Sequence, residues 1–244
     1  MTDNADKSEM LPDGERPDVG AAVALASDEA HALEAYLRSK RTAVLAILFS
    51  DIEGWTRMTE ERGEAYAAQV RKFFRAQTVE IAQRDGAGWV VKDLGDSFLC
   101  VFAEPSTAVA RALEMQEVFR LFSSETGETA GAPIADGGWR MADSGSKAQG
   151  LRVRIGIHMG QVSVEESLQL DVFGRHVNRA ARVTSLAGGG QVYVTRPVYD
   201  SAQGWLKDWE ARGLRWANHG SYRLKGIDEP MEIFEATDTR WAAP

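Results

Sequence analysis

The chain has 244 residues, 44% of them hydrophobic, so it is long enough to bury a full core as one large domain with flanking segments. Its formal net charge of -8 and pI near 5.1 argue against a nucleic-acid-binding surface, which needs a basic stripe. A single cysteine, Cys100, allows no internal disulfide, and the sequence shows neither a signal peptide nor an apolar run that spans a membrane, which together predict a cytoplasmic protein.

The N-terminal part of the chain is expected to be flexible at first and then helical. Residues 1–26 are rich in Asp, Glu, Gly, Pro and Ser, which predicts a flexible acidic tail. The pattern over 27–41 predicts a helix with an apolar stripe through Leu33 and Leu37. We expect this helix to pack on its own domain; the alternatives are a dimer contact or a connector to a regulatory partner.

The segment 42–60 is the one around which the rest of the sequence is organised. Residues 43–49 are almost all apolar, which predicts a buried central strand that ends just before Asp51 and Gly54. An acid at the end of such a strand, next to a helix start, is suited to hold a divalent cation against a phosphate, because carboxylates are hard ligands and free helix amides favour anions. The alternative is that Asp51 only caps the helix.

The remaining elements alternate between helices and strands. Apolar residues at helical spacing predict helices at 63–84, 105–121 and 174–186. Alternating or β-branched runs predict strands at 89–92, 97–102, 151–158, 161–167, 191–195, 222–224 and 231–235. A turn is expected at Met159 and Gly160, and residues 123–150, which have few aliphatic side chains, predict a mobile insertion. The order βαββα, then ββαβ and closing strands, predicts an α/β sandwich whose mixed sheet is covered by helices.

Two acidic side chains are expected to meet in this fold. A βαββ unit places the ends of its strands side by side, which brings Asp51 next to Asp96 in the bend at 94–96. A Gly-Asp pair is common in turns, so Asp96 by itself indicates little. Two converging carboxylates, however, are suited to hold two divalent ions, the arrangement used for in-line phosphoryl transfer.

Four sequence motifs resemble the signatures of class III nucleotidyl cyclases. They are FSDIEGWT at 49–56, VKDLGDSFLCVF at 91–102, LRVRIGIHMGQV at 151–162 and DVFGRHVNRAAR at 171–182. Their order and approximate spacing also match, which makes the signal far more specific than any one motif. The resemblance covers about residues 42–237 and leaves a tail at 238–244. It implies a class III cyclase homology domain, with a mainly antiparallel sheet and a ferredoxin-like βαββαβ core.

The resemblance implies a role for the residues after the first strand and in the hairpin. Asp51 and Asp96 are expected to ligate two metal ions, Mg²⁺ or Mn²⁺, together with the carbonyl of Ile52. The β- and γ-phosphates are expected to face the backbone amides of Ile52, Glu53, Gly54 and Trp55. Lys225 is expected to reach the triphosphate. A turn lysine is the alternative interpretation of Lys225.

Further positions are implied to read the base and stabilise the transition state. Lys92 and Asp171 complement adenine, which presents an acceptor at N1 and a donor at its amino group, whereas guanine reverses both. Asn178 is expected to orient the ribose, and Arg182, one helical turn later, to stabilise charge on the transferring phosphate. The structural alternatives are that Asp171 caps a turn and that the two helix residues are merely solvated. His158 is interpreted as a packed, hydrogen-bonded core histidine, since no other His or Cys stands near it at metal-ligand spacing.

Together the motifs predict an adenylate cyclase that converts ATP to 3′,5′-cyclic AMP and pyrophosphate. The resemblance implies a homodimer with two sites, in which one protomer supplies Asp51 and Asp96 and its partner supplies Lys92, Asp171, Asn178 and Arg182. The short segment 161–170 leaves the exact dimer contact open. One alternative is a cyclase that uses GTP or a pyrimidine nucleotide, and another is an inactive nucleotide-binding signalling module. A diguanylate cyclase is disfavoured because its GG-D/E-EF hairpin is replaced by Leu94–Phe98.

Overall fold

The computed structural model describes residues 32–122, 150–166 and 170–240. The helices are α2 (Ala32–Arg38), α3 (Trp55–Arg62), α4 (Glu64–Gln83), α5 (Pro105–Arg120), α6 (Arg175–Leu186), α7 (Arg196–Ala202) and α8 (Lys207–Arg212), with 3₁₀ turns η1 (Arg84–Gly86) and η2 (Gln203–Trp205). The strands are β1 (Thr42–Ile52), β2 (Gly88–Asp93), β3 (Ser97–Phe102), β4 (Val153–Glu166), β5 (Leu170–Phe173), β6 (Val192–Thr195), β7 (Leu214–Tyr222) and β8 (Met231–Asp238). The expected acidic tail, the start of the 27–41 helix, nearly all of the expected insertion and the last four residues of the chain lie outside the described residues.

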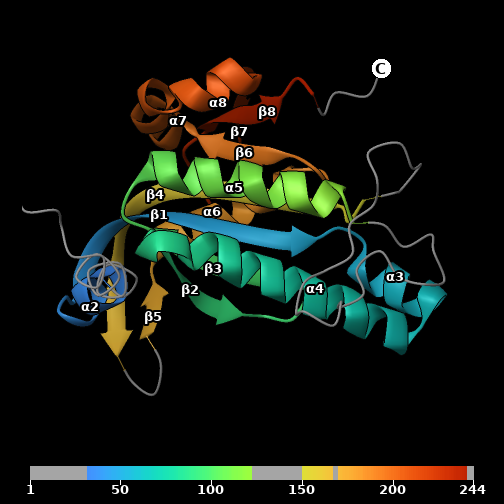
Figure 1. The fold of residues 1–244 in the computed structure, drawn as a ribbon. Coiled ribbons are helices and arrows are strands. Elements are labelled where there is room, and N and C mark those ends of the chain that lie inside the picture. Colours follow the sequence, from blue (N-terminus) through green and yellow to red (C-terminus); the bar gives the residue numbers. More distant parts are fainter. Residues whose placement is uncertain (1–31, 123–149, 167–169, 241–244) are drawn as a thin grey trace, which may run out of the picture.

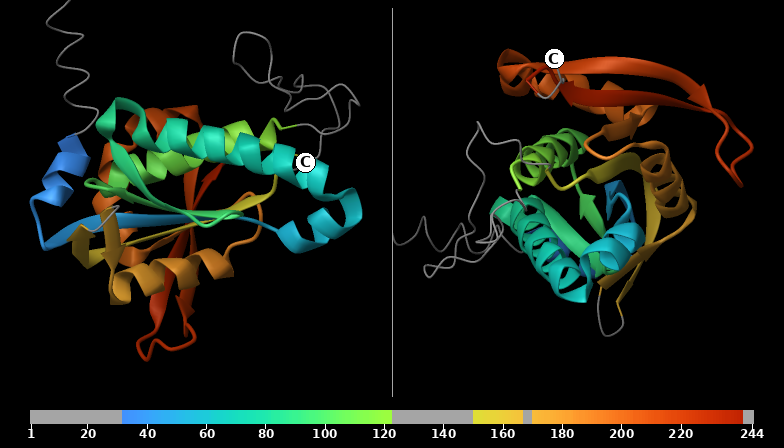
Figure 2. Two further views of the ribbon diagram at one scale, coloured as in Figure 1. Left: turned by 90° about the horizontal axis from the view of Figure 1, so that it is seen from below. Right: turned by 90° about the vertical axis from the view of Figure 1, so that its right-hand side faces the viewer.

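The strands form one mixed sheet, as predicted. Its order is β2-β3-β1-β4-β6-β8-β7, and β5 pairs with the far end of β4. Among the pairs in the described part of the chain, only β4 and β6 run parallel. Helices α4 and α5 cover one face of the sheet and α6 lies on the other (Figure 1; Figure 2, left). The first part follows the predicted βαββα order, whereas the later strands and helices differ in part from the prediction, as described below.

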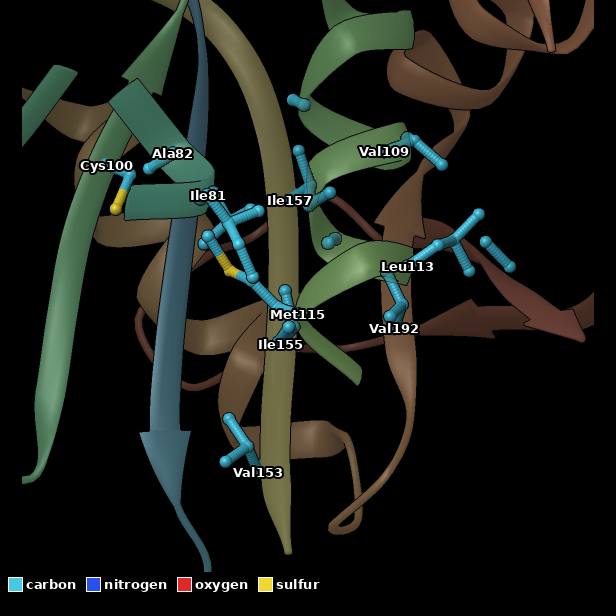
Figure 3. Packing of buried hydrophobic residues seen from close by; sticks show 14 of the residues in the cluster. Ile81, Ala82, Cys100, Val109, Leu113, Met115, Val153, Ile155, Ile157 and Val192 are labelled. Atoms are coloured by element: carbon cyan, nitrogen blue, oxygen red, sulfur yellow. The ribbon is translucent and has the colours of Figure 1, made fainter. Parts of the chain in front are cut away.

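The centre of the sheet is buried on both faces. Along β1, Ala46 and Leu48 join the cluster under α4 and α5, while Leu45 and Ile47 join a second cluster on the opposite face. This division follows from the alternation of side chains along a strand. Figure 3 shows the first cluster, where side chains of α4 and α5 meet those of β4 and β6. Because β1 is paired with β3 on one side and β4 on the other, the position of its last residues is fixed by both neighbours.

Helix α2 packs on its own domain, as expected. Leu33 is 8% exposed and Leu37 is fully buried, and both belong to the second cluster together with Leu45 and Val162. The helix ends at Arg38, earlier than the expected Arg41. Within the described ranges, no helix combines the length and the apolar character needed to cross a bilayer.

The predicted turn at Met159 and Gly160 is wrong. Strand β4 runs without interruption from Val153 to Glu166, and its hairpin partner is β5. Gly160 instead faces α6, where an added Cβ would lie under 3.0 Å from the ring of His176. This glycine therefore serves close packing between a strand and a helix, a use that a sequence does not distinguish from a turn.

The last part of the chain also differs from expectation. Residues 196–212, to which no element was assigned, form α7, η2 and α8. Of the expected strand at 222–224, only Tyr222 is in a strand, as the last residue of β7, which begins at Leu214. β7 is an edge strand of the sheet, and most of its side chains are at least partly exposed. An edge strand of this kind lacks the apolar alternation that predicts a strand.

Candidate functional site

Asp51 and Asp96 lie close together where two neighbouring strands meet their loops: Asp51 is near the end of β1, and Asp96 directly precedes β3. Asp51 is the next-to-last residue of β1 and pairs with Ser97 of β3, the residue directly after Asp96. The carbonyl of Asp96 accepts a hydrogen bond from the amide of Ile52 at 2.9 Å, which holds the bend at 94–96 against the end of β1. The sheet therefore brings the two carboxylates into one region, as the βαββ order predicted.

The carboxylate of Asp51 is paired with an arginine that the sequence analysis did not single out. Arg154 lies opposite Asp51 on β4, and its Nε donates to Asp51 Oδ2 at 2.5 Å. Burial raises the pKa of Asp51 above the usual 3.8; the hydrogen bond and charge of Arg154 oppose this shift, while the negative charge of Asp96 adds to it. The alternation of Arg152 and Arg154 with apolar residues was visible in the sequence, but the β1–β4 register that selects Arg154 was not.

The donor set at this edge fits a magnesium ion that is shared with a phosphate ligand. Mg²⁺ is usually held by one or two carboxylates, and phosphates and water complete its shell. The described residues contain no group of three or more His, Cys, Asp or Glu side chains that could enclose a metal. The chain thus offers the two carboxylates of Asp51 and Asp96 and the backbone carbonyl of Ile52, and a cation there would relieve the repulsion between the carboxylates.

The loop between β1 and α3 is fixed by its own hydrogen bonds. Gly54 adopts a left-handed conformation (φ 72°) at the N-cap of α3, which glycine allows without strain. The amide of Ile52 donates to Asp96, and the amide of Glu53 donates to the carbonyl of Arg152 at 2.9 Å. Two of the four amides expected to face phosphates are therefore already paired in this structure.

The side chain of Glu53 turns away from this loop. Its carboxylate accepts from Arg152 Nε at 2.5 Å and from the amide of Gly189 at 3.0 Å. The hydrogen bond from Arg152, followed by that from Gly189, lowers the pKa of Glu53 below its usual value. Glu53 thus ties the loop after β1 to the segment that follows α6.

Lys92 and Asp171 are brought together by β2 and β5. The distance from Lys92 Nζ to Asp171 Oδ2 is 2.8 Å, and the side chains are 43% and 34% exposed. A shift of register between Val90 and Lys92 interrupts the β2–β3 ladder, and such bulges commonly re-aim a side chain. The other oxygen of Asp171 accepts from the amide of Val172 at 2.7 Å, so the carboxylate is held in place from two sides.

Asn178 and Arg182 both lie on the exposed side of α6. The helix buries Ala180, Val183 and Thr184 against the sheet, and Asn178 and Arg182 project from the remaining surface. A pocket of about 310 Å³ separates Asn178 from the β7–β8 connection and is lined there by residues 226–229. Lys225, which is exposed, immediately precedes that lining. The fold thus places the loop of Lys225 beside the helix that carries the other two predicted residues.

Within one chain, Asp51 and Asp171 pair with residues far apart on β4, whereas Lys92 lies on the β2–β3 hairpin that also carries Asp96. Asp51 pairs with Arg154, whereas Asp171 pairs with Glu165, eleven residues further along the strand. At about 3.3 Å per residue, this corresponds to roughly 36 Å of strand contour.

His158 is a packed core histidine, as predicted. It is 3% exposed, and its Nδ1 lies 2.9 Å from the hydroxyl of Thr195. Its Nε2 lies 2.9 Å from Nδ1 of His176. A second histidine therefore does stand beside it. The separation of 18 residues hid this contact, because it depends on how α6 packs on β4.

Comparison with known proteins identifies the group to which this architecture is similar. A family model described as the adenylate and guanylate cyclase catalytic domain matches residues 37–236. An uncharacterized protein of Mycobacterium tuberculosis is 28% identical over 190 residues, which cover 78% of this chain and 40% of that protein. The receptor-type adenylate cyclase GRESAG 4.3 of Trypanosoma brucei brucei is 29% identical over 213 residues, 80% of this chain and 17% of the relative.

The fold is also similar to that of a solved bacterial enzyme. The crystal structure of the adenylyl cyclase CyaB from P. aeruginosa matches with a TM-score of 0.63 and 22% sequence identity. The match covers 83% of this chain and 98% of that one. The matched region is less than half the length of each of the two curated relatives. In the CyaB structure it covers nearly the whole chain.

Proposed function

Because this chain belongs to the adenylate and guanylate cyclase catalytic domain family, we propose that it converts ATP to 3′,5′-cyclic AMP and pyrophosphate as a homodimer. The observation that carries the choice of ATP is the pair Lys92–Asp171, with 2.8 Å between Nζ and Oδ2. It presents a donor and an acceptor side by side on partly exposed side chains. Adenine offers the complementary acceptor and donor at N1 and its amino group.

The register of β4 supports a site shared between protomers. The strand partners of Asp51 and Asp171 are eleven residues apart on β4, whereas a single nucleotide must contact metals through its phosphates and the reading groups through its base. Two chains related by a two-fold axis bring the Asp51 end of one to the Asp171 end of the other, and a dimer then holds two equivalent sites.

At the metal-side end, Asp51 and Asp96 are the proposed ligands. Two bound divalent ions, Mg²⁺ or Mn²⁺, supply activation of the ribose 3′-hydroxyl and stabilisation of phosphate charge. To bind a metal ion, Asp51 must give up its ion pair with Arg154. The guanidinium of Arg154 is then available to bind an anion. The amides of Ile52 and Glu53 are engaged, so contact of the loop with the β- and γ-phosphates falls to Gly54 and Trp55.

The partner protomer supplies α6 and the β7–β8 connection. Asn178 orients the ribose, and Arg182 stabilises the charge that grows on the transferring phosphate. Lys225 approaches the triphosphate from the neighbouring loop. The described residues offer no side chain that is an obvious dedicated general base, so the chain's own contribution is mainly position and charge.

A cytoplasmic location forms part of this proposal. Cys100, the single cysteine, is buried, and burial raises the pKa of its thiol to about 12, so the thiol stays protonated and unreactive.

The second candidate function is a guanylate cyclase, since the family includes both activities. It requires that residues other than Lys92 and Asp171 read the base.

Complementation between two inactive chains tests the shared site. Asp51→Ala removes a metal ligand and Arg182→Ala removes the transition-state contact, so each chain alone is expected to be inactive. A mixture that exchanges subunits should regain about a quarter of wild-type activity, since half of the dimers are mixed and each holds one intact site. Subunit exchange is verified with two affinity tags. A mixture that exchanges and yet stays inactive contradicts the two-protomer site.

A further inference from the structure

Helix α6 lies directly on β4 at two glycines. A Cβ added at Gly156 would come under 3.0 Å from the backbone of Thr184, and one added at Gly160 would come equally close to the ring of His176. The two glycines are four residues apart on β4 and so face the same side of the sheet. The helix is therefore seated at both ends, by backbone contact near Thr184 and by an imidazole ring near Gly160.

The contact at Gly160 continues as a chain of hydrogen bonds into the sheet. Nδ1 of His176 lies 2.9 Å from Nε2 of His158, and Nδ1 of His158 lies 2.9 Å from the hydroxyl of Thr195. The two rings are nearly coplanar and lie side by side, with centroids 5.1 Å apart and an interplanar angle of 18°. His158 and Thr195 are buried, at 3% and 1% exposure. Three elements, α6, β4 and β6, are thus joined by one line of polar contacts.

His176 is the polar first member of the stripe by which α6 contacts the sheet. At i+4 and i+8 it is followed by the buried Ala180 and Thr184. Asn178 lies two residues after His176, which is roughly 200° around the helix. The face that carries Asn178 and Arg182 is therefore opposite the face that His176 anchors, and the rotation of α6 at His176 sets where both side chains point.

We propose that His158 and His176 are positioning residues for Asn178 and Arg182, because they fix the rotation and depth of the first half of α6. This inference rests on the proposed function, in which those two residues contact the reacting nucleotide. A misplacement of about 1 Å in such a group can cost on the order of a hundredfold in rate.

The pair is suited to this role because it stays uncharged near neutral pH. Burial, together with the charges of His176 and Arg179, lowers the pKa of His158 to about 3. Burial and the charges of Arg179 and Arg175 lower the pKa of His176 as well. One proton between the two facing nitrogens satisfies both, so the contact needs no counter-ion. Loss of either partner leaves a buried nitrogen of the other without its hydrogen bond.

Two substitutions at His176 separate ring volume from hydrogen bonding. His176→Phe keeps an aromatic ring but has no nitrogen for His158. His176→Asn loses the ring but keeps a polar atom near the position of Nδ1. We expect His176→Phe to lower kcat about tenfold or more with little change in KM, because the affected groups act mainly in the transition state. His176→Asn should retain most of kcat.

Complementation shows whether the effect is exerted through α6 at the reacting site. In a mixture of Asp51→Ala and Arg182→Ala chains, the one intact site uses α6 of the Asp51→Ala chain. His176→Phe placed in that chain should lower the recovered activity about tenfold or more. The same substitution in the Arg182→Ala chain should leave the recovered activity near that of the parent mixture, because that helix serves the dead site.

The outcomes separate this inference from the proposed function. No recovery in the parent mixture contradicts the two-protomer site itself. Recovery in the parent, with equal activity for both placements of His176→Phe, overturns the positioning role alone. If His176→Phe does not fold, Thr195→Val is placed in the same two chains, since it breaks the far end of the line while keeping the side-chain shape. It should show the same dependence on placement, and equal activities overturn the inference.

Discussion

Asp171 and Lys92 form an ion pair with 2.8 Å between Oδ2 and Nζ, although the two residues belong to β5 and β2. Partly exposed pairs of this kind contribute little to the free energy of unfolding. The significance of the pair is therefore its geometry, since β2 and β5 hold a donor and an acceptor at adjacent points. A base that binds here must replace the contact that the two side chains make with each other.

Base choice follows from this pair. Guanine places N1–H against the ammonium and O6 against the carboxylate, so both contacts become unfavourable. Two buried mismatches of about 1–3 kcal/mol each give roughly a hundredfold or greater preference for ATP. The double variant Lys92→Glu/Asp171→Cys should weaken ATP use and raise GTP use relative to it, measured as kcat/KM for both nucleotides. Lys207→Glu, a charge reversal on exposed α8, should leave the ratio unchanged.

The metal ligands predict loss of activity without loss of fold. Asp51→Ala and Asp96→Ala should each lower Mg²⁺-dependent turnover about a hundredfold or more, because metal stabilisation of phosphate charge is worth several kcal/mol. The Asn variants should be milder, since an amide carbonyl still ligates weakly. Circular dichroism checks the fold, and Asp208→Ala on α8 is the control. Near-normal turnover in either alanine variant would refute the assignment.

The pKa of Asp51 predicts how stability depends on pH without metal. Because burial raises this pKa, the folded chain favours the neutral carboxyl. The corresponding stability is complete below the unfolded-state value, near 3.8, and is lost as pH rises through the raised folded value. In EDTA, Asp51→Asn should therefore gain stability relative to wild type between about pH 4 and pH 7. At pH 7, Mn²⁺ should raise the Tm of wild type more than that of the variant.

Thermal melts across that pH range check both statements. A wild-type chain that gains stability relative to Asp51→Asn as pH rises in EDTA is incompatible with the raised pKa. An equal Mn²⁺ shift in both chains is incompatible with Asp51 as a ligand.

The close contact between His176 and Gly160 predicts that a larger residue at position 160 destabilises the fold. Gly160→Ala forces a methyl group against the imidazole ring, and overpacking of this kind costs about 1–3 kcal/mol. Gly204→Ala is the matched control, because an added Cβ there meets no atom within 4 Å. Urea titrations of the two variants give the free energies of unfolding. Equal stabilities would show that α6 shifts away from β4 without strain.

Much of the fold, and the proximity of Asp51 to Asp96, was accessible from sequence because the informative signals are local. The apolar run before Asp51, the Gly-Asp bend at Asp96 and the spacing of α4 and α6 each occupy one short segment. Arg154 and the His158–His176 contact were missed because they depend on strand register and helix seating, which link residues far apart in the chain. Gly160 was misassigned for the same reason, since its neighbour in space is α6 and not the adjoining residues.

The identity of the product is the most direct test that this chain is an adenylate cyclase. The purified chain is incubated separately with ATP, GTP, CTP and UTP in the presence of Mg²⁺ or Mn²⁺, and products are identified by chromatography and mass spectrometry. We predict cyclic AMP and equimolar pyrophosphate from ATP, formed roughly a hundredfold faster than any product from GTP at equal concentration. Activity per chain should fall on dilution as the dimer dissociates. Faster turnover of another triphosphate, or a folded dimer that forms no cyclic nucleotide, would contradict the proposed function.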